Sequence, residues 1–203
     1  MRIGIVNYGM GNIQSLTGAL EHIGLNDILY TNKHEELVSC DKLFLPGVGS
    51  FTEAIKQIKA KRLDKIIFEF SKLKPTMGIC LGMQLMASLG YENGKSKGLD
   101  LVKGEVVKFH LKNCKIPHIG FNQVKFDNNS ELFSGIKNNS DFYFTHSYHF
   151  INKEDLVTST CNYETEFISS FEKRNIIGVQ FHPELSQGPG IKLLTNFIKK
   201  INA

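Results

Sequence analysis

Residues 76–82, TMGICLG, form a short apolar run that enters a tight turn and leads into a candidate helix at 83–89. Two earlier segments have the same organisation. Each consists of a strand, a glycine turn and a helix: 2–7, 9–11 and 12–23 in the first, and 42–45, 46–49 and a helix capped by Ser50 in the second. The first half of the chain is therefore predicted to contain three strand–turn–helix units.

Strands that alternate with helices favour an α/β fold built on an open, doubly wound, mostly parallel sheet with helices on both faces. The three glycine turns would then lie along one edge of the sheet. The second half predicts strands with little helix between them, at 102–110, 120–126, 141–147, 165–172 and 176–181. We expect these strands to form an antiparallel extension, followed by an amphipathic surface helix at 190–201.

Length and composition favour one domain, residues 1–203, because 41% hydrophobic and 22% charged residues are close to the averages for globular proteins. A net charge of +4 with scattered lysines gives no support for nucleic-acid binding. No apolar run reaches the roughly 18 residues of a membrane span, and the first residues lack the features of a secretory signal. We therefore expect a cytoplasmic protein without a membrane partner.

The four cysteines, Cys40, Cys80, Cys114 and Cys161, are widely spaced and include no CxxC pair, so neither a disulfide framework nor a metal site is expected. Cys80 differs from the others because it stands in the G-x-nucleophile-x-G frame of a strand-to-helix elbow. Such an elbow exposes its central side chain, and the following helix N-terminus stabilises a thiolate. The alternative is a buried cysteine packed at a turn.

His182 and Glu184 favour the catalytic interpretation, because a thiol nucleophile needs an imidazole base and a third group that orients it. Pro183 is expected to hold the chain extended, so that His182 and Glu184 point to the same side. An H-x-E metal pair or a loop histidine beside an exposed glutamate are the alternatives. His146 and His149 could likewise be a metal pair, but ordinary polar residues at the edge of a cleft are favoured.

A nucleotide cofactor is not expected at Gly9-Met10-Gly11, because Gln14 occupies the place of the third glycine of a dinucleotide loop. The turn at Gly47-Val48-Gly49 leaves its backbone free to approach a ligand, or is simply a sharp turn at a strand end. Neither motif decides the function alone.

Three motifs taken together resemble the triad-type (class I) glutamine amidotransferases: LPGVGSF at 45–51, GICLGMQLM at 78–86 and GVQFHPE at 178–184. The resemblance implies a Cys-His-Glu triad of Cys80, His182 and Glu184, with no cofactor. It further implies an oxyanion hole at Val48, Gly49 and Leu81. The implied glutamine-binding residues are Gly47, Gly49, Gly82, Gln84, Ser147 and Tyr148.

Within that family, VNYGMGNIQSL at 6–16, PHIGFNQV at 117–124 and YFTHSYHF at 143–150 are most similar to glutaminase subunits that pass ammonia to a (β/α)₈-barrel cyclase in histidine biosynthesis. The resemblance implies a heterodimer with the cyclase docked on Asn12, Phe121, Asn122 and Leu185. Phe121 and Leu185 stand where those subunits usually have tryptophan and lysine. A paralogous subunit that serves a synthase aminating a surface sugar is therefore the alternative.

Two other classes of protein remain open on the residues alone. One is a non-catalytic binding protein that keeps the fold, against which the intact Cys80, His182 and Glu184 argue. The other is a cysteine peptidase or another hydrolase built on a similar elbow, which would act on peptides or esters in place of glutamine.

Overall fold

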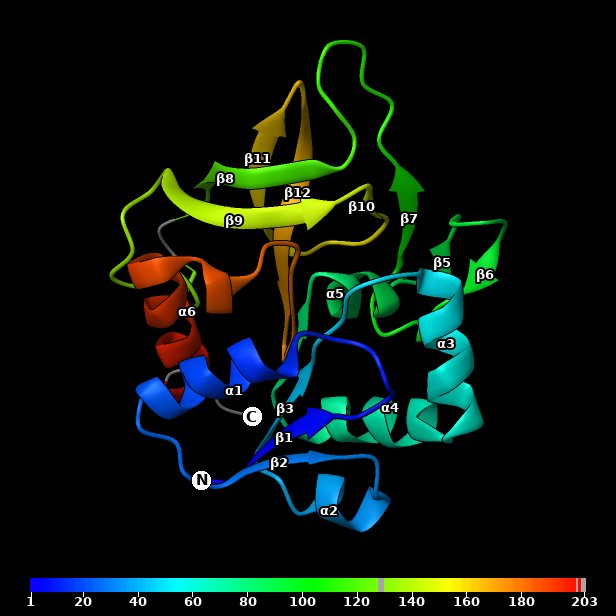
Figure 1. Ribbon diagram of the computed structural model, residues 1–203, viewed down its shortest axis with the longest axis vertical. Helices are drawn as coiled ribbons and strands as arrows, with labels where there is room; N and C mark the ends of the chain where they lie inside the picture. Colours follow the sequence, from blue (N-terminus) through cyan, green and yellow to red (C-terminus); the bar gives the residue numbers. More distant parts are fainter. Residues whose placement is uncertain (128–129, 200, 202–203) are drawn as a thin grey trace.

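The computed structural model describes residues 1–127, 130–199 and 201, and its centre is a nine-stranded sheet in the order β2-β1-β3-β4-β13-β12-β11-β8-β9 (Figure 1). A second sheet has the order β10-β7-β5-β6. The strands are β1 (Ile3–Val6), β2 (Ile28–Thr31), β3 (Lys42–Leu45), β4 (Thr76–Ile79), β5 (Leu89–Gly90), β6 (Ser96–Lys97), β7 (Gly104–Lys108), β8 (His118–Lys125), β9 (Ser140–His146), β10 (Tyr148–Asn152), β11 (Val157–Tyr163), β12 (Thr165–Lys173) and β13 (Ile176–Val179). The helices are α1 (Ile13–His22), α2 (His34–Val38), α3 (Phe51–Ala60), α4 (Leu63–Leu73), α5 (Leu81–Leu85), the 3₁₀ helix η1 (Pro183–Leu185) and α6 (Gln187–Lys199).

The parallel half of the large sheet consists of β2, β1, β3, β4 and β13. Every residue of β1, β3 and β4 is buried, which is the property of continuous apolar runs covered on both faces. Because these three strands are neighbours and run in one direction, their carboxyl ends and the glycine turns that follow lie along one edge, as predicted. The edge strand β2 is half-exposed and carries no periodic signal, so the sequence analysis did not identify it.

The antiparallel half begins where β13 pairs with β12 and continues through β11, β8 and β9. The expected α/β fold with an antiparallel extension is confirmed. The large sheet has four antiparallel strand pairings in this extension and four parallel pairings in the other half. Its strands alternate buried and exposed residues because one face packs on the core.

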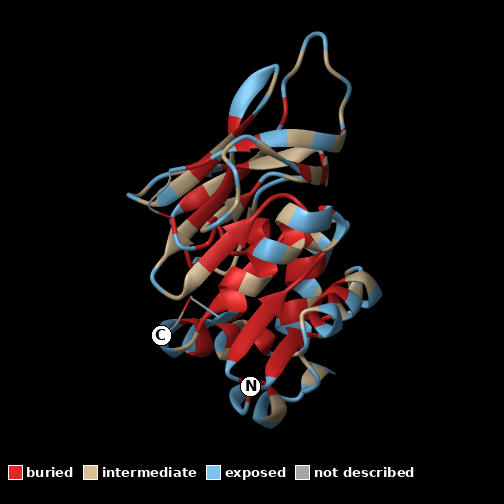
Figure 2. Ribbon diagram, turned by 90° about the vertical axis from the view of Figure 1, so that its left-hand side faces the viewer, coloured by how far each residue is buried: buried red, intermediate tan, exposed pale blue. Residues whose placement is uncertain are grey.

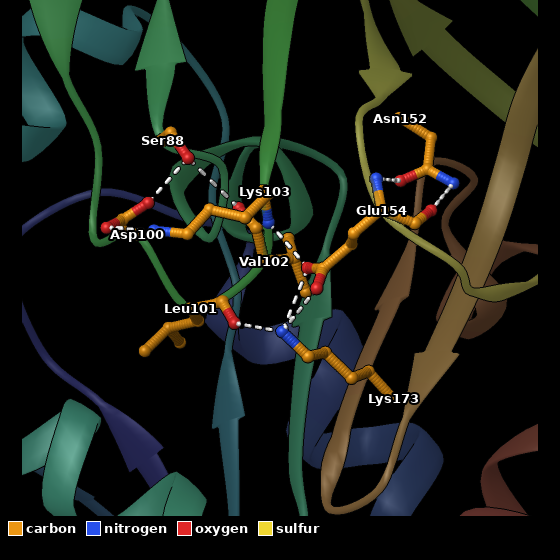
Figure 3. Close-up of polar contacts among 8 residues, drawn as sticks. All are labelled: Ser88, Asp100, Leu101, Val102, Lys103, Asn152, Glu154 and Lys173. Atoms are coloured by element: carbon orange, nitrogen blue, oxygen red, sulfur yellow. Dashed lines mark hydrogen bonds and ion pairs between the residues drawn. The ribbon is translucent and has the colours of Figure 1, made fainter.

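The second sheet was not predicted, and a polar network at its base joins it to the large sheet (Figure 3). Glu154 accepts a hydrogen bond from the Lys103 backbone N–H at 2.6 Å and forms an ion pair with Lys173 of β12 at 2.8 Å. Lys173 also donates to the Leu101 carbonyl at 3.4 Å, and Lys103 pairs with Asp100 at 2.7 Å. These contacts tie the loop before β7 and the loop after β10 to the long β11–β12 hairpin.

Helices cover both faces of the parallel half, as expected. The face toward α1 and α6 contains Ile3, Ile5 and Phe44 together with Leu20 and Phe197. The opposite face packs side chains of α3, α4 and α5 against alternate residues of the same strands. Figure 2 shows the buried strands running through the lower part of the molecule, whereas exposed residues concentrate in loops and in the projecting hairpins.

Two local predictions were wrong. The helix expected at 83–89 is α5, which begins at Leu81 and ends at Leu85, while Leu89 lies in β5. Ser50 precedes α3 but makes no side-chain capping hydrogen bond. Instead, the Glu92 carboxylate accepts the Phe51 backbone N–H at 2.6 Å, so a carboxylate distant in sequence stabilises the start of α3.

Among the described residues, no helix combines the length and the apolarity needed to cross a membrane.

Candidate active site

Cys80 lies at a sharp elbow between β4 and α5, with φ 52° and ψ −109°. The flanking glycines are required by close backbone contacts. A Cβ on Gly82 would lie 1.6 Å from the Leu45 carbonyl oxygen, and a Cβ on Gly78 would lie 2.7 Å from the backbone of Gly82. The G-x-C-x-G pattern is thus explained by packing. The expected exposure of the Cys80 side chain is wrong, because this residue is only 5% exposed.

His182 and Glu184 come from the segment that follows β13, the strand paired with β4. His182 Nδ1 lies 2.7 Å from Glu184 Oε1, and both side chains are 3% exposed. The expected juxtaposition is therefore present, but its cause differs from the prediction. Pro183 begins the 3₁₀ helix η1 instead of extending the chain, and this single turn brings Glu184 back to the ring.

The electrostatics of this pair favour a charged imidazole. Burial lowers the pKa of His182, but the negative charges of a Cys80 thiolate and of Glu184 outweigh burial and raise the pKa above its ordinary value. His182 Nε2 is fully buried and has no hydrogen-bond partner among the described residues. The ring is thus oriented through its Nδ1 contact with Glu184.

A cavity of about 250 Å³ opens beside Cys80. It is lined by Val48, Gly49, Cys80, Leu81, Gln84, Glu92, Pro117, Thr145, His146, Ser147 and Tyr148. The structure thus brings together most of the residues proposed for the glutamine pocket and the oxyanion hole. Gly47 and Gly82 do not line the cavity, because both are buried behind its wall. A Cβ on Gly47 would lie 2.2 Å from Tyr8 Oη.

A hydrogen bond from Tyr8 supports the turn that carries Val48 and Gly49. The buried Tyr8 hydroxyl donates a hydrogen bond to the Pro46 carbonyl at 2.5 Å. Burial, and next the neighbouring Cys80, raise the pKa of Tyr8, so its hydroxyl remains a donor. Val48 itself is 41% exposed and Gly49 has φ +110°, so the outer part of the turn is glycine-dependent and open to the cavity.

Several residues at the site were missed by the sequence analysis. Gln180 Nε2 lies 3.7 Å from Cys80 Sγ, and the sulfur lies 3.8 Å from the Thr145 carbonyl oxygen. Glu92 contributes a carboxylate from the loop between β5 and β6, which has no helical or strand periodicity. Its place at the site depends on its contact with the start of α3, which the sequence does not reveal. Gln180 stands inside the GVQFHPE motif and could have been noticed there.

His146 lines the cavity, whereas His149 stacks on Phe109 with ring centroids 4.6 Å apart. Within residues 1–127, 130–199 and 201, no three His, Cys, Asp or Glu side chains are grouped so that they could hold a metal ion.

The four residues expected to face a partner lie on neighbouring elements. Asn12 precedes α1, which contacts η1, where Leu185 is 37% exposed. Phe121 of β8 is 51% exposed and meets Tyr143 of β9 edge-on at 5.5 Å, while Asn122 is partly buried beside it. Since β9 also contacts η1, the elements that carry these residues are neighbours, although Phe121 and Asn122 point to opposite faces of β8.

An α/β sheet with a cysteine at a strand-to-helix elbow and a buried histidine–glutamate pair is the arrangement of cysteine-dependent hydrolases. The fold is shared with a solved glutamine amidotransferase at a TM-score of 0.75 and 16% identity, over 98% of this chain and 97% of that chain.

Residues 4–201 match the family "Glutamine amidotransferase class-I", and the chain belongs to this family. It is 42% identical to "Imidazole glycerol phosphate synthase subunit HisH" of Aquifex aeolicus (strain VF5), over 98% of this chain and 97% of that protein. It is 44% identical to "Imidazole glycerol phosphate synthase subunit HisH 1" of Campylobacter jejuni (strain RM1221), over 97% of this chain and 99% of that protein.

Proposed function

We propose that this protein is the glutaminase subunit of an imidazole glycerol phosphate synthase, which hydrolyses glutamine to glutamate and supplies the ammonia for imidazole ring formation in histidine biosynthesis. The observation that carries the proposal is the placement of Cys80 at the wall of a cavity, next to the buried His182–Glu184 pair. Full-length similarity to two HisH subunits supports the assignment to this synthase.

In the first step, the Cys80 thiolate attacks the side-chain amide carbon of glutamine, and a carbon–sulfur bond forms. The negative charge that develops on the amide oxygen is stabilised by backbone N–H groups. Leu81 offers one, because the first N–H groups of a helix have no acceptor within the helix. Val48 and Gly49 also line the cavity and offer the others.

Collapse of this intermediate breaks the carbon–nitrogen bond. His182 Nε2 gives its proton to the departing nitrogen, and ammonia leaves. In the second step, water gives a proton to the same nitrogen and its oxygen attacks the thioester, which releases glutamate and regenerates the thiolate. Glu184 stabilises the imidazolium at each stage and keeps the proton of Nδ1 in place, and it acts through the ring without touching the substrate.

The remaining walls of the cavity fit the polar ends of glutamine. Glu92 provides a carboxylate for the α-ammonium group, and it is held in place by the Phe51 backbone N–H. Ser147 and Tyr148 provide another wall, which Gln84 supports because its side-chain amide donates to the Tyr148 carbonyl at 2.9 Å. Gln84 therefore acts by fixing this wall.

Ammonia released into water at neutral pH becomes mostly ammonium, so the product must pass to the synthase along a dry path. We assign the docking of a (β/α)₈-barrel cyclase to the side that carries Asn12, Phe121, Asn122 and Leu185. The exposed Phe121 and Leu185 offer apolar contact area to a partner. Reorientation of the backbone at Val48, which the adjacent glycines permit, would couple docking to the oxyanion hole.

Glutamate release by the purified protein, alone and with the cyclase from the same organism, tests the proposal. Strong stimulation that requires both the cyclase and the ribulosyl precursor of the imidazole ring supports the histidine-pathway assignment. If the cyclase does not change the rate of glutamine turnover but a sugar-aminating synthase stimulates it, the ammonia acceptor is the sugar-aminating synthase and not the cyclase. Cleavage of peptides or esters in preference to glutamine would reject the glutaminase assignment.

A further inference from the structure

A continuous chain of hydrogen bonds runs from the partly buried Asn122 to the wall of the cavity. Asn122 Nδ2 lies 3.4 Å from His118 Nε2, His118 Nδ1 lies 3.2 Å from His146 Nε2, and His146 Nδ1 lies 2.8 Å from the Tyr148 carbonyl oxygen. His118 and His146 are opposite each other on the paired strands β8 and β9. The chain therefore runs along the inward face of β8, from Asn122 to the wall of the pocket.

The chemistry of the two ends fixes the direction of every bond in this chain. The Tyr148 carbonyl can only accept, so His146 Nδ1 carries a proton and, in the neutral ring, Nε2 is an acceptor. His118 must then donate from Nδ1, which makes its own Nε2 an acceptor for Asn122. The orientation of the Asn122 amide agrees, because Oδ1 accepts the Gln123 backbone N–H at 2.8 Å and Nδ2 also donates to the Asn162 carbonyl at 2.9 Å.

Aromatic packing holds both rings in planes that allow this chain. His118 stacks between Tyr163, with ring centroids 4.0 Å apart, and Phe144, at 4.8 Å. His146 packs against Phe109 and Phe167 at 5.3 and 5.2 Å. The two histidines are 2% and 6% exposed, so solvent has little access to either ring. Each lost hydrogen bond would leave a buried polar atom unsatisfied.

We propose that His118 and His146 are positioning residues for the glutamine pocket, and that both are neutral with the proton on Nδ1. The Tyr148 carbonyl receives two hydrogen bonds, one from His146 and one from Gln84 at 2.9 Å, which use both of its lone pairs. The peptide group that joins Tyr148 to His149 is thereby fixed beside the part of the cavity that Ser147 and Tyr148 line. This inference rests on the proposed function for its effect on glutamine, but not for the hydrogen-bond chain itself.

The chain can be tested without any activity measurement. In a two-dimensional ¹H–¹⁵N spectrum of protein with ¹⁵N-labelled histidine, recorded near neutral pH, both His118 and His146 should have the nitrogen shifts of a ring protonated at Nδ1 only. Protonation at Nε2, or at both nitrogens, in either ring would overturn the proposal. Assignment follows from the loss of one signal set in His118→Phe and in His146→Asn.

The effect on the pocket is tested by kinetics of the complex with its cyclase. His118→Phe keeps the ring stacking but removes the donor to His146, and we expect the KM for glutamine to rise about 3- to 10-fold with kcat within about twofold. His118→Asn keeps a donor near the position of Nδ1 and should restore a KM near that of the wild type. His149→Phe is the matched control, because His149 belongs to the same aromatic cluster but lies outside the chain.

A KM in His118→Phe equal to that of the control, or a loss of kcat alone, would contradict a role in positioning the pocket. An inactive wild-type complex whose spectrum still has both rings protonated at Nδ1 would reject the proposed function and keep the hydrogen-bond chain. The two failures are therefore distinguishable.

Discussion

The Glu184 carboxylate lies 2.7 Å from Nδ1 of His182, and both side chains are almost completely buried. A carboxylate in this position fixes which ring nitrogen carries the proton and stabilises the imidazolium. The contact depends on a single 3₁₀ turn that starts at Pro183. The three consecutive residues His182, Pro183 and Glu184 are therefore enough to bring the carboxylate to the ring.

Glu184→Gln should retain an acceptor for His182 but remove its charge. We expect kcat for glutamine hydrolysis to fall by about a hundredfold or more. The pKa of His182 should also fall, because one of the two negative charges that raise it is removed. The alkaline limb of the pH–rate profile, where the imidazolium loses the proton it must give to ammonia, should move to lower pH. Steady-state kinetics across pH would measure both effects.

Glu69→Gln is the matched control for this variant, because Glu69 is an exposed carboxylate in a surface ion pair with Lys72. It should leave the profile unchanged. A Glu184→Gln enzyme with wild-type kcat would remove Glu184 from the mechanism.

Gly82→Ala should disrupt the elbow, because the new Cβ would lie 1.6 Å from the Leu45 carbonyl oxygen. We expect the free energy of unfolding to decrease by at least about 2 kcal/mol. Gly18→Ala in α1 is the matched control, since nothing lies within 4 Å of its new methyl group, and it should gain about 0.5–1 kcal/mol. Urea denaturation distinguishes them, and equal stabilities would contradict the packing explanation of the motif.

Phe121→Ala should weaken the complex with the cyclase, because exposed aromatic residues at the centre of an interface commonly contribute most to affinity. We expect the Kd to rise about tenfold or more. Leu73→Ala removes a side chain that is 71% exposed at the end of α4, beside the amino ends of the parallel strands, and should have no effect. Isothermal titration calorimetry would measure both, and equal affinities would move the interface elsewhere.

Stability should depend on pH through the buried histidines. Burial lowers the pKa of His118 to about 4 and that of His146 to about 3, from an ordinary value of 6.5. Between about pH 6.5 and 4 the unfolded chain binds protons that the folded protein does not, so the free energy of unfolding should decrease as the pH is lowered. In His118→Phe the slope of the free energy of unfolding against pH should decrease by the equivalent of about one bound proton. Denaturation at several pH values would measure it.

The exposed His34 offers a control, and its replacement by Asn should leave the slope as in the wild type. A His118→Phe slope as steep as that of the wild type would mean that His118 is charged in the folded protein.

The parallel half of the fold was predictable because β1, β3 and β4 are buried on both faces and end in glycine turns whose spacing is visible in the sequence. The strands β2 and β11 were not predictable in this way. Strand β2 is a half-exposed edge strand. Strand β11, VTSTCNY, has few apolar residues and is held in the sheet by its pairing with β12 and β8.

The candidate site divides in a similar way. Cys80, His182 and Glu184 stand in short local patterns, and their geometry follows from one elbow and one turn. Glu92 and the His118–His146 pair depend on tertiary contacts between segments that are distant in sequence. Gly47 and Gly82 lie in the motifs for a packing reason that a sequence pattern cannot separate from ligand binding.

The most direct test of Cys80 as nucleophile is mass spectrometry of the intact protein after treatment with a glutamine-analogue inactivator, followed by peptide mapping. The account predicts one adduct, located on Cys80 and absent in Cys80→Ala, with glutamine protecting against its formation. An adduct on the partly exposed Cys114, or no adduct in a folded protein that still hydrolyses glutamine, would contradict it.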